Sequence, residues 1–154
     1  MIALSAIAGI GEAKAASPEQ AGHFTGEGLF PRGEKNDAYA RYFTGTSYLY
    51  RLTSEEVSIS NVTFEPGCRN FWHIHNKSGQ ILLATEGRGW YQEWGKPAQE
   101  LKPGDVVHVA PGVKHWHGAA KDSCFAHLSV SVPTEGASTE WLEPVTDEEY
   151  KCLQ

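Results

Sequence analysis

The chain has 154 residues, of which 40% are hydrophobic and 21% are charged, and its formal net charge is −6. This length fits one domain with a single core. The acidic balance and the lack of a lysine or arginine cluster argue against a nucleic-acid-binding surface, and no apolar run approaches the ~20 residues of a membrane-spanning helix. We therefore expect a soluble domain whose partners are neither nucleic acid nor membrane.

Residues 1–17, MIALSAIAGIGEAKAAS, are set apart from the folded domain. A short apolar stretch precedes an A-x-A pattern of the kind that signal peptidase cleaves, but no basic residue precedes that stretch. A signal peptide and a disordered leader both stay open, and with them a cytoplasmic or a periplasmic or secreted location. Residues 18–41, rich in charged residues and glycine, are predicted to form an extended N-terminal arm, and residues 42–154 the folded domain.

Short aromatic and β-branched runs, broken by glycine and proline, follow residue 42. They predict β-strands at residues 48–50, 57–64, 71–75, 81–85, 90–94, 106–109, 115–117 and 125–132. The glycines within residues 86–89 predict a hairpin between two of these strands. Turn signals recur about every 8 to 12 residues, which predicts an all-β sandwich or barrel. Only the tail predicts a helical turn, because Thr146-Asp147-Glu148-Glu149 resembles a capped helix start.

Four of the seven histidines form two pairs on predicted strands, His73 with His75 and His115 with His117. Residues two apart on a strand point to the same face, so each pair presents two imidazoles to one side. A single pair of this kind faces solvent by chance about as often as it binds a metal. Here both pairs follow a Pro-Gly turn among aromatic residues, and Gln80 begins the next strand, where a hairpin would return it to the same interior. Imidazole and amide oxygen suit a divalent first-row metal, so we predict a metal site.

The spacing around the first pair resembles the first motif of the cupins: Gly67, five residues, His73-x-His75, four residues, Gln80, six residues, Gly87. In that motif a glutamate normally occupies the place of Gln80. The neutral ligand is therefore a departure from the family pattern at the metal itself.

Residues 104–115 resemble the second cupin motif, which supplies one further histidine ligand. Ala110, where a proline is usual, and Ala119, where an asparagine is frequent, depart from it at structural positions. With the strand pattern, the resemblance extends over about residues 42–132. It implies a single-domain cupin, a double-stranded β-helix or jelly-roll barrel, with an extended N-terminal arm and a short C-terminal helical turn.

Within the cupins, the run GDVVHVAPGVKHWHGAA and the neutral glutamine are similar to the small single-domain cupins that include the manganese-dependent bacterial hydroxynitrile lyases. This resemblance implies that the metal ligands are His73, His75, Gln80 and His115. It places two further histidines, His117 and His127, in the substrate pocket as candidates for catalysis.

The substrate pocket also takes candidates from nearby positions. Asn70 occupies a place where a threonine is expected in these relatives, and Ser131 one where a glutamine is expected, so pocket shape differs. Phe64 is predicted to be an apolar wall of the substrate-binding pocket.

A neutral fourth ligand leaves the +2 charge of the ion uncompensated, whereas a glutamate would cancel one unit. Such a site should be a stronger Lewis acid and a better anion binder, but should hold its ion less tightly. Four protein ligands leave one or two open positions on an octahedral ion. One Mn or Fe ion per chain therefore fits better than tetrahedral Zn, while Ni and Co also fit by ligand type.

The sharpest function that follows is the cleavage or formation of cyanohydrins, with His117 or His127 transferring the proton. His117 is favoured because it shares a strand face with His115; its alternative role is to orient water or a ligand. Two other functions stay open. One is an Fe- or Mn-dependent dioxygenase using the same site, and the other is a non-enzymatic metal- or ligand-binding cupin.

The remaining residues of note are predicted to have structural roles. His108 should face away from the ligands, His23 should be solvated in the arm, and the Gly67 turn argues against metal binding by Cys68. Tryptophans predicted to pack in a core or dimer interface are Trp90, Trp94 and Trp141. The cysteines, interpreted as free thiols, are Cys68, Cys124 and Cys152. By the family resemblance, the arm and exposed strands favour a homodimer.

Overall fold

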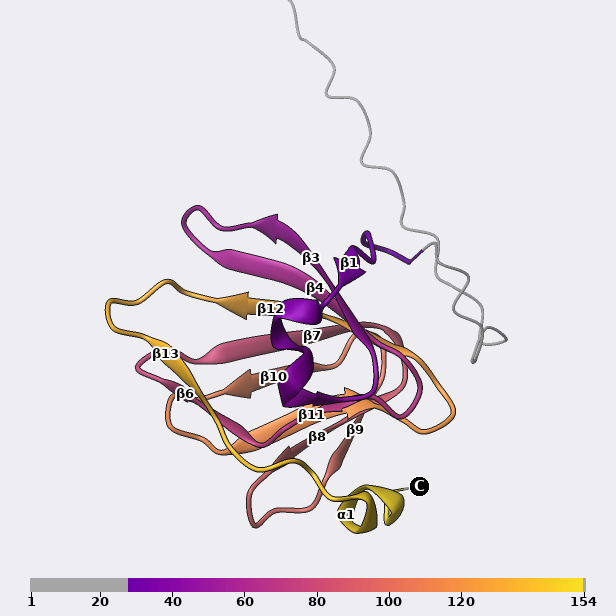
Figure 1. The fold of residues 1–154 in the computed structure, drawn as a ribbon. Coiled ribbons are helices and arrows are strands. Elements are labelled where there is room, and N and C mark those ends of the chain that lie inside the picture. The colour runs from indigo at the N-terminus through magenta and orange to yellow at the C-terminus, as the bar shows by residue number, and fades with distance from the viewer. Residues whose placement is uncertain (1–27, 154) are drawn as a thin grey trace, which may run out of the picture.

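The computed structural model describes residues 28–153, so the leader, the first part of the arm and His23 lie outside the described residues. The chain forms two antiparallel sheets with the core between them (Figure 1). In order across it, the first sheet contains β1 (Glu34–Lys35), β3 (Ser47–Thr53), β4 (Ser58–Phe64), β12 (Phe125–Ser131), β7 (Gln80–Gly87) and β10 (Val106–Val109). The main path of the second contains β13 (Ser138–Trp141), β6 (His73–Asn76), β11 (His115–Ala119), β5 (Arg69–Asn70) and β2 (Phe43–Thr44). On the other side of β11, β8 (Gly89–Glu93) pairs with β11 and with β9 (Gln99–Leu101).

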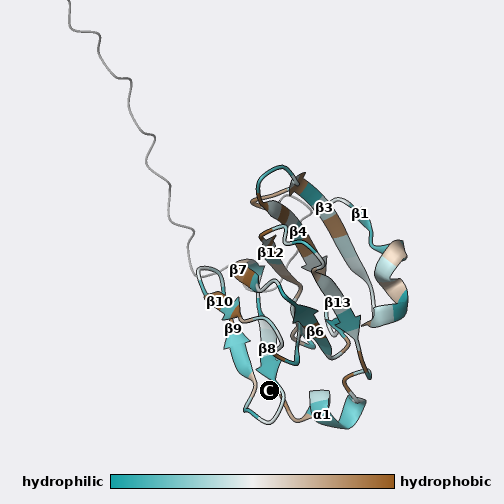
Figure 2. Cartoon of the chain, turned by 90° about the vertical axis from the view of Figure 1, so that its left-hand side faces the viewer, coloured by the Kyte–Doolittle hydropathy of each residue, from teal (hydrophilic) through white to brown (hydrophobic). Residues whose placement is uncertain are grey.

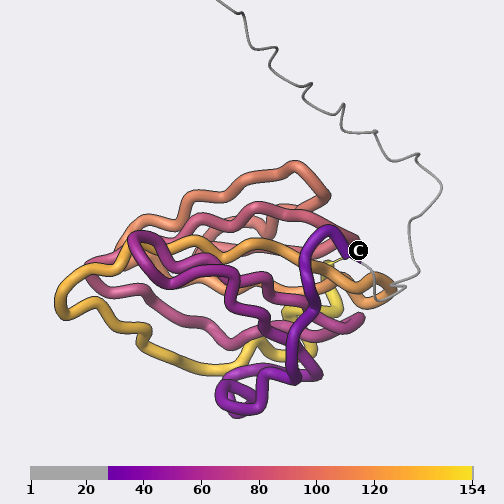
Figure 3. Tube along the Cα trace, turned by 90° about the horizontal axis from the view of Figure 1, so that it is seen from above, coloured from indigo at the N-terminus to yellow at the C-terminus, as the bar shows by residue number. Residues whose placement is uncertain are grey.

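Every strand predicted from the sequence is present, and the predicted all-β fold is confirmed. The short strands β1, β2, β5, β9 and β13 were not predicted, nor was the 3-10 helix η1 (Asp37–Tyr42) within the arm. Figure 3 shows η1 lying beside β13, where Tyr42 stacks on Trp141 with ring centroids 4.7 Å apart. None of the described helices is long and apolar enough to cross a membrane.

The predicted hairpin between β7 and β8 is wrong, because the two strands lie in different sheets. β7 pairs with β12 and β10, whereas β8 pairs with β11 and β9. The glycines serve a close approach: a Cβ on Gly87 would lie 1.8 Å from the Cys124 carbonyl oxygen, and one on Gly89 would lie 2.5 Å from Phe125. The glycine-rich segment therefore carries the chain from one sheet to the other.

Two apolar clusters hold the sheets in place. The first core cluster lies between them and contains Val62, Phe64, Cys68, Leu82, Ala84, Tyr91, Leu101, Val107, Val109, Ala119 and Phe125. The second core cluster joins the second sheet to the C-terminal segment and contains Trp72, Trp90, Trp116, Ala120, Val145 and Tyr150. As a result, all five residues of β11 are buried. Figure 2 shows that the neighbouring strands β6 and β13 consist largely of hydrophilic residues.

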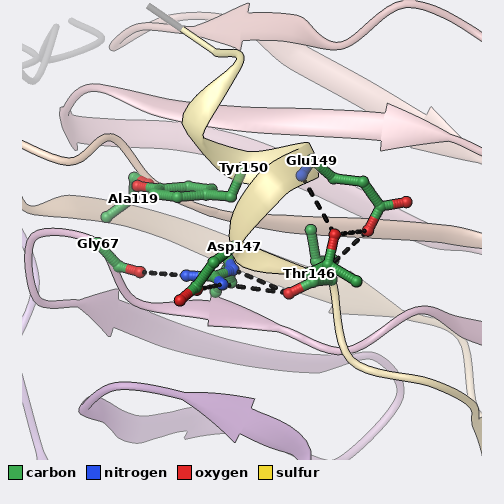
Figure 4. A network of polar contacts seen from close by, with 8 residues as sticks. Gly67, Ala119, Thr146, Asp147, Glu149 and Tyr150 are labelled. Atoms are coloured by element: carbon green, nitrogen blue, oxygen red, sulfur yellow. Dashed lines mark hydrogen bonds and ion pairs between the residues drawn. The ribbon is translucent and has the colours of Figure 1, made fainter.

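The C-terminal helix α1 (Asp147–Lys151) is fixed against the second sheet by polar contacts (Figure 4). The predicted capped start is confirmed, since Thr146 and Glu149 form a capping box. The Tyr150 hydroxyl donates to the Ala119 carbonyl oxygen at 2.7 Å. Arg69, only 4% exposed, donates to Val145 O at 3.1 Å and to Asp147 Oδ1 at 2.6 Å. We refer to these contacts around Arg69 and Tyr150 as the C-terminal clasp.

Arg69→Met should lower the free energy of unfolding by about 2 to 4 kcal/mol, because the buried carbonyl of Val145 and the half-buried carbonyl of Gly67 lose their donor. Urea unfolding measures the change. The matched control is Arg41→Met, since the exposed Arg41 lies over the Tyr42 ring and should contribute less than about 1 kcal/mol. Equal losses in the two variants would show that the clasp does not stabilise the fold.

Candidate metal centre and pocket

The predicted site residues gather around a cavity of about 340 Å³ between the two sheets. The first sheet contributes Phe64, Gln80 and His127 to its walls, among others. The second contributes Asn70, His73, His75 and His117, and His115 packs directly behind them. A cavity of this volume suits a small molecule.

Strand pairing brings the two histidine motifs together. His73 on β6 lies directly opposite His115 on β11, and their ring centroids are 4.1 Å apart. The His75 ring lies 5.0 Å from that of His73 and 5.2 Å from that of His115. Three imidazoles from two motifs therefore converge on one place.

The hydrogen bonds of His73 and His115 fix which ring nitrogen is free. Their Nδ1 atoms lie 2.9 Å from the carbonyl oxygens of Phe71 and Val113. A carbonyl oxygen only accepts, so each Nδ1 carries the proton and each Nε2 has a lone pair. The His115 Nε2 is buried and has no hydrogen-bond partner among the described residues. This is the arrangement that a metal-binding imidazole requires.

Gln80 reaches the histidines from the first sheet. Its Oε1 accepts a hydrogen bond from His75 Nε2 at 3.1 Å, which brings these two candidate ligand atoms together. Its Nε2 donates to Ser129 Oγ at 2.8 Å, and His75 Nδ1 lies 3.1 Å from Thr139 Oγ1. The sequence suggested that a hairpin returns Gln80 to His75, and this is wrong. The strands of the two residues belong to different sheets, and the turn that links them contains Lys77 with φ 65°.

His117 also lies next to this cluster. Ligand atoms of His73, His115 and His117, all buried, lie within 4.8 Å of one another. A group of three histidines suits a metal site in a cupin. Of the predicted ligands, this group contains His73 and His115 but not His75, whose ring lies 5.0 and 5.2 Å from theirs. The assignment of His73, His75, Gln80 and His115 as the ligands stays a prediction.

Asn70 determines the surroundings of His117. Its Oδ1 accepts from the backbone N–H of His117 at 2.9 Å, which turns its amide nitrogen toward the ring, 3.1 Å from Nε2. The same amide nitrogen lies 3.4 Å from Nδ1, and because an amide nitrogen only donates, at least one ring nitrogen of His117 is an acceptor. Asn70 thus orients His117 in addition to lining the cavity.

His127 differs from His117 in having both ring nitrogens buried and without a side-chain hydrogen-bond partner in the described part of the chain, although the backbone of Leu128 lies close enough to raise its pKa. Its ring packs between Phe64 and Phe125, at centroid distances of 5.7 and 5.6 Å, and lies 4.9 Å from the ring of His117. Burial of an unpaired imidazole is costly, which is why the rare examples usually have a function.

The imidazoles of the site are neutral because burial disfavours their charged form. Burial lowers the pKa of His115 and of His127 to about 4. Burial and then the neighbouring histidines lower the pKa of His73 and of His117 well below the ordinary value. Neutral imidazoles can bind a metal or accept a proton.

The remaining predicted residues are placed as follows. Cys68 belongs to the first core cluster, where burial raises the pKa of its thiol to about 12, and the exposed His108 lies away from the ligands. Trp90 is buried in the second core cluster, while Trp94 is exposed. Trp141 instead lines the cavity, with its ring 4.7 Å from that of His73.

Sequence reasoning missed several residues of the cavity. Ser129 lies two residues after His127 on β12, so the same-face rule applied to the histidine pairs would have found it. Thr139 and Trp141 lie on the mainly exposed β13, and Arg51 on β3, where no spacing pattern marks them.

The fold and the histidine cluster define a β-barrel protein of the cupin type. Residues 60–131 match the cupin domain, and the chain belongs to the cupin family. Its relatives include an (R)-mandelonitrile lyase from Granulicella tundricola, 44% identical over 116 residues that cover 73% of this chain and 88% of the relative.

Solved structures agree with this assignment. The crystal structure of a cupin-like protein from Thermotoga maritima is 42% identical, with a TM-score of 0.76 over 82% of this chain and 96% of that chain. The DMSP lyase DddQ from Ruegeria pomeroyi is 17% identical, with a TM-score of 0.57 over 79% of this chain and 63% of that chain, and shows likeness of fold alone.

Replacing a histidine of the cluster should abolish tight metal binding. In His115→Ala, the affinity for Mn²⁺ should fall by at least about 100-fold, since loss of even an outer partner of a ligand costs 10- to 100-fold. Metal content after equilibrium dialysis and the thermal shift on adding Mn²⁺ measure this loss. The matched control is His108→Ala, which removes an exposed histidine and should bind like the wild type. Unchanged binding in His115→Ala would contradict the site.

Buried His127 should also make the metal-free protein sensitive to acid. Between pH 6.5 and about 4 the unfolded chain binds a proton at this position and the folded protein does not. The free energy of unfolding should therefore fall as the pH falls through this window, by about 3 kcal/mol from this group. In His127→Gln, urea unfolding at pH 7 and pH 4 should show a smaller loss by about that amount. Parallel pH profiles would contradict a neutral, buried His127.

Proposed function

We propose that the protein is a metal-dependent lyase that cleaves and forms cyanohydrins of small aryl aldehydes. The observation that carries the proposal is the buried imidazole of His127, which has no side-chain hydrogen-bond partner among the described residues and lies beside a set of neutral candidate ligands. The 44% identity to an (R)-mandelonitrile lyase supports the same reaction class.

In this proposal His73, His75, Gln80 and His115 hold one divalent ion per chain, with Mn²⁺ as the preferred metal. When bound, the ion supplies Lewis acidity to the substrate oxygen and attraction for the cyanide anion. The free Nε2 of His115 supports this ligand set, and the hydrogen bond between His75 and Gln80 shows that these two side chains meet at the same place. Because all four side chains are neutral, none of them offsets the positive charge that favours an anionic leaving group.

The proton is assigned to His127, with His117 as its neighbour in the pocket. The neutral His127 ring accepts the hydroxyl proton of the cyanohydrin, the carbonyl forms, and the electron pair of the breaking C–C bond leaves with cyanide. The same proton then passes from the imidazolium to cyanide, which gives an aldehyde and hydrogen cyanide. The lack of a side-chain hydrogen-bond partner on its ring favours His127 for this role, since the His117 ring already accepts from Asn70.

Phe64 and Asn70 are assigned to substrate binding. Phe64 contacts both His117 and His127 at centroid distances of 5.7 Å and offers an apolar wall for an aryl group. Asn70 is assigned to keeping the His117 ring in its acceptor form.

A homodimer completes the proposal. Support comes from large apolar side chains that are exposed on strands of the first sheet, namely Tyr50, Leu52, Ile81 and Val106. A second copy of the chain would remove such side chains from water.

The test is cleavage of mandelonitrile to benzaldehyde, followed by absorbance, with metal-stripped protein before and after reloading with Mn²⁺. Activity should return with Mn²⁺ and fall by about 10²- to 10⁴-fold in His127→Ala, as expected for the loss of a proton-transfer group. The control, His108→Ala, should retain the wild-type rate. No activity in folded, Mn-loaded protein would reject the lyase and favour the oxygen-dependent alternative, which oxygen uptake with a catechol or diketone would reveal.

A further inference from the structure

The cavity has a single formal charge on its wall. Among the described residues that line it, Arg51 is the only one with a permanent charge, and no aspartate or glutamate lines it. The other polar groups are neutral imidazoles, amides and hydroxyls. Although the chain has a net charge of −6, its cavity therefore offers positive charge alone.

Strand register places Arg51 across the cavity wall from the ligand cluster. Arg51 on β3 pairs with Ser60 on β4, and Ser60 pairs with Ser129 on β12. Two strand spacings separate Arg51 from Ser129, or about 10 Å between their backbones. Ser129 accepts a hydrogen bond from the candidate ligand Gln80, so it marks the end of the cavity where the histidines lie. The separation between Arg51 and this end is about the length of a small aromatic molecule.

Arg51 is also without a partner. The other described arginines each contact a carboxylate or an aromatic ring: Arg32, Arg41, Arg69 and Arg88. No side-chain hydrogen bond, ion pair or ring contact joins the Arg51 guanidinium to another of the residues between 28 and 153. A β-bulge follows immediately, between Arg51 and Thr53, and bulges commonly redirect side chains at the rim of a barrel.

The wall next to Arg51 is apolar. Leu49, two residues earlier on β3, lines the cavity with Val62 and Phe64, and Trp141 faces them from the second sheet. These side chains suit a flat ring. A guanidinium at the rim suits a carboxylate, which it binds through two parallel hydrogen bonds.

We propose that Arg51 is a specificity-determining residue that selects aryl substrates with a carboxylate on the side of the ring away from the reacting carbon. The inference rests on the proposed function, because it takes the aldehyde or cyanohydrin end to lie at the histidine cluster. The substrate carboxylate supplies the negative charge that the cavity wall lacks. With a neutral substrate, the Arg51 guanidinium has only water as a partner.

The test compares the binding of 4-formylbenzoate with that of 4-formylbenzamide, a neutral molecule of nearly the same shape, by calorimetry on the Mn-loaded protein at low ionic strength. The wild type should bind the carboxylate about five- to tenfold more tightly than the amide. In Arg51→Gln the ratio of the two dissociation constants should fall to about one, and Arg51→Lys should restore part of it. Lys121→Gln, which removes an exposed charge outside the cavity, should keep the wild-type ratio.

An equal affinity of the wild type for both molecules would overturn the inference. So would a carboxylate preference that survives Arg51→Gln, since the ion and not the guanidinium would then bind the carboxylate. These binding ratios do not depend on turnover, so they separate the two proposals. If Arg51→Gln loses the carboxylate preference and the protein cleaves no cyanohydrin, the role of Arg51 stands and the lyase proposal is rejected. If the protein cleaves cyanohydrins but shows no carboxylate preference, the lyase proposal stands and the role of Arg51 is rejected.

Discussion

The pairing of His73 with His115 across β6 and β11 is the constraint on which the site depends. It joins two motifs that are far apart in the chain and sets their imidazoles side by side. Because alternate residues of a strand face opposite ways, the same register sends His117 into the cavity and Trp116 to the other side, into the second core cluster. A shift of one residue would exchange these faces.

The packing behind β11 keeps this register in place. Trp116 contacts Trp72 and Tyr150, and the C-terminal clasp holds Tyr150 against the carbonyl of Ala119. The buried Arg69 in that clasp directly precedes Asn70, which orients His117. The C-terminal segment therefore supports the cavity from outside, without contributing a ligand.

Local patterns in the sequence were sufficient to predict eight of the thirteen described strands and to place each histidine pair on one strand face, while the joining of the two pairs in one site came from the resemblance to the cupin motifs. Alternation within each strand is set by nearby residues, and the same rule placed His73 with His75 and His115 with His117. The pairing of strands was not predictable, since a glycine-rich turn between β7 and β8 gives the same local signal whether the chain folds back or crosses to another sheet. The glycines are explained only by Cys124 and Phe125, which approach from a distant part of the chain.

Residues of the cavity that lack a pattern also escaped prediction. Trp141 reaches His73 because β13 pairs with β6, and the exposed sequence of β13 gives no sign of that pairing. Arg51 has the same difficulty, because its importance depends on an absence of carboxylates around the cavity that becomes visible only in three dimensions.

The candidate ligands fall into two halves that differ in how evolution can alter them. His73 and His115 are oriented by the main-chain carbonyls of Phe71 and Val113, which no substitution at those positions removes. His75 and Gln80 are oriented by the side chains of Thr139 and Ser129, each of which a single codon change can delete. The orientation of one pair of candidate ligands therefore resists substitution of the residues around it, whereas the orientation of the other pair depends on two replaceable hydroxyl groups. Gln80, which stands where the cupin motif normally has a glutamate, belongs to the second pair.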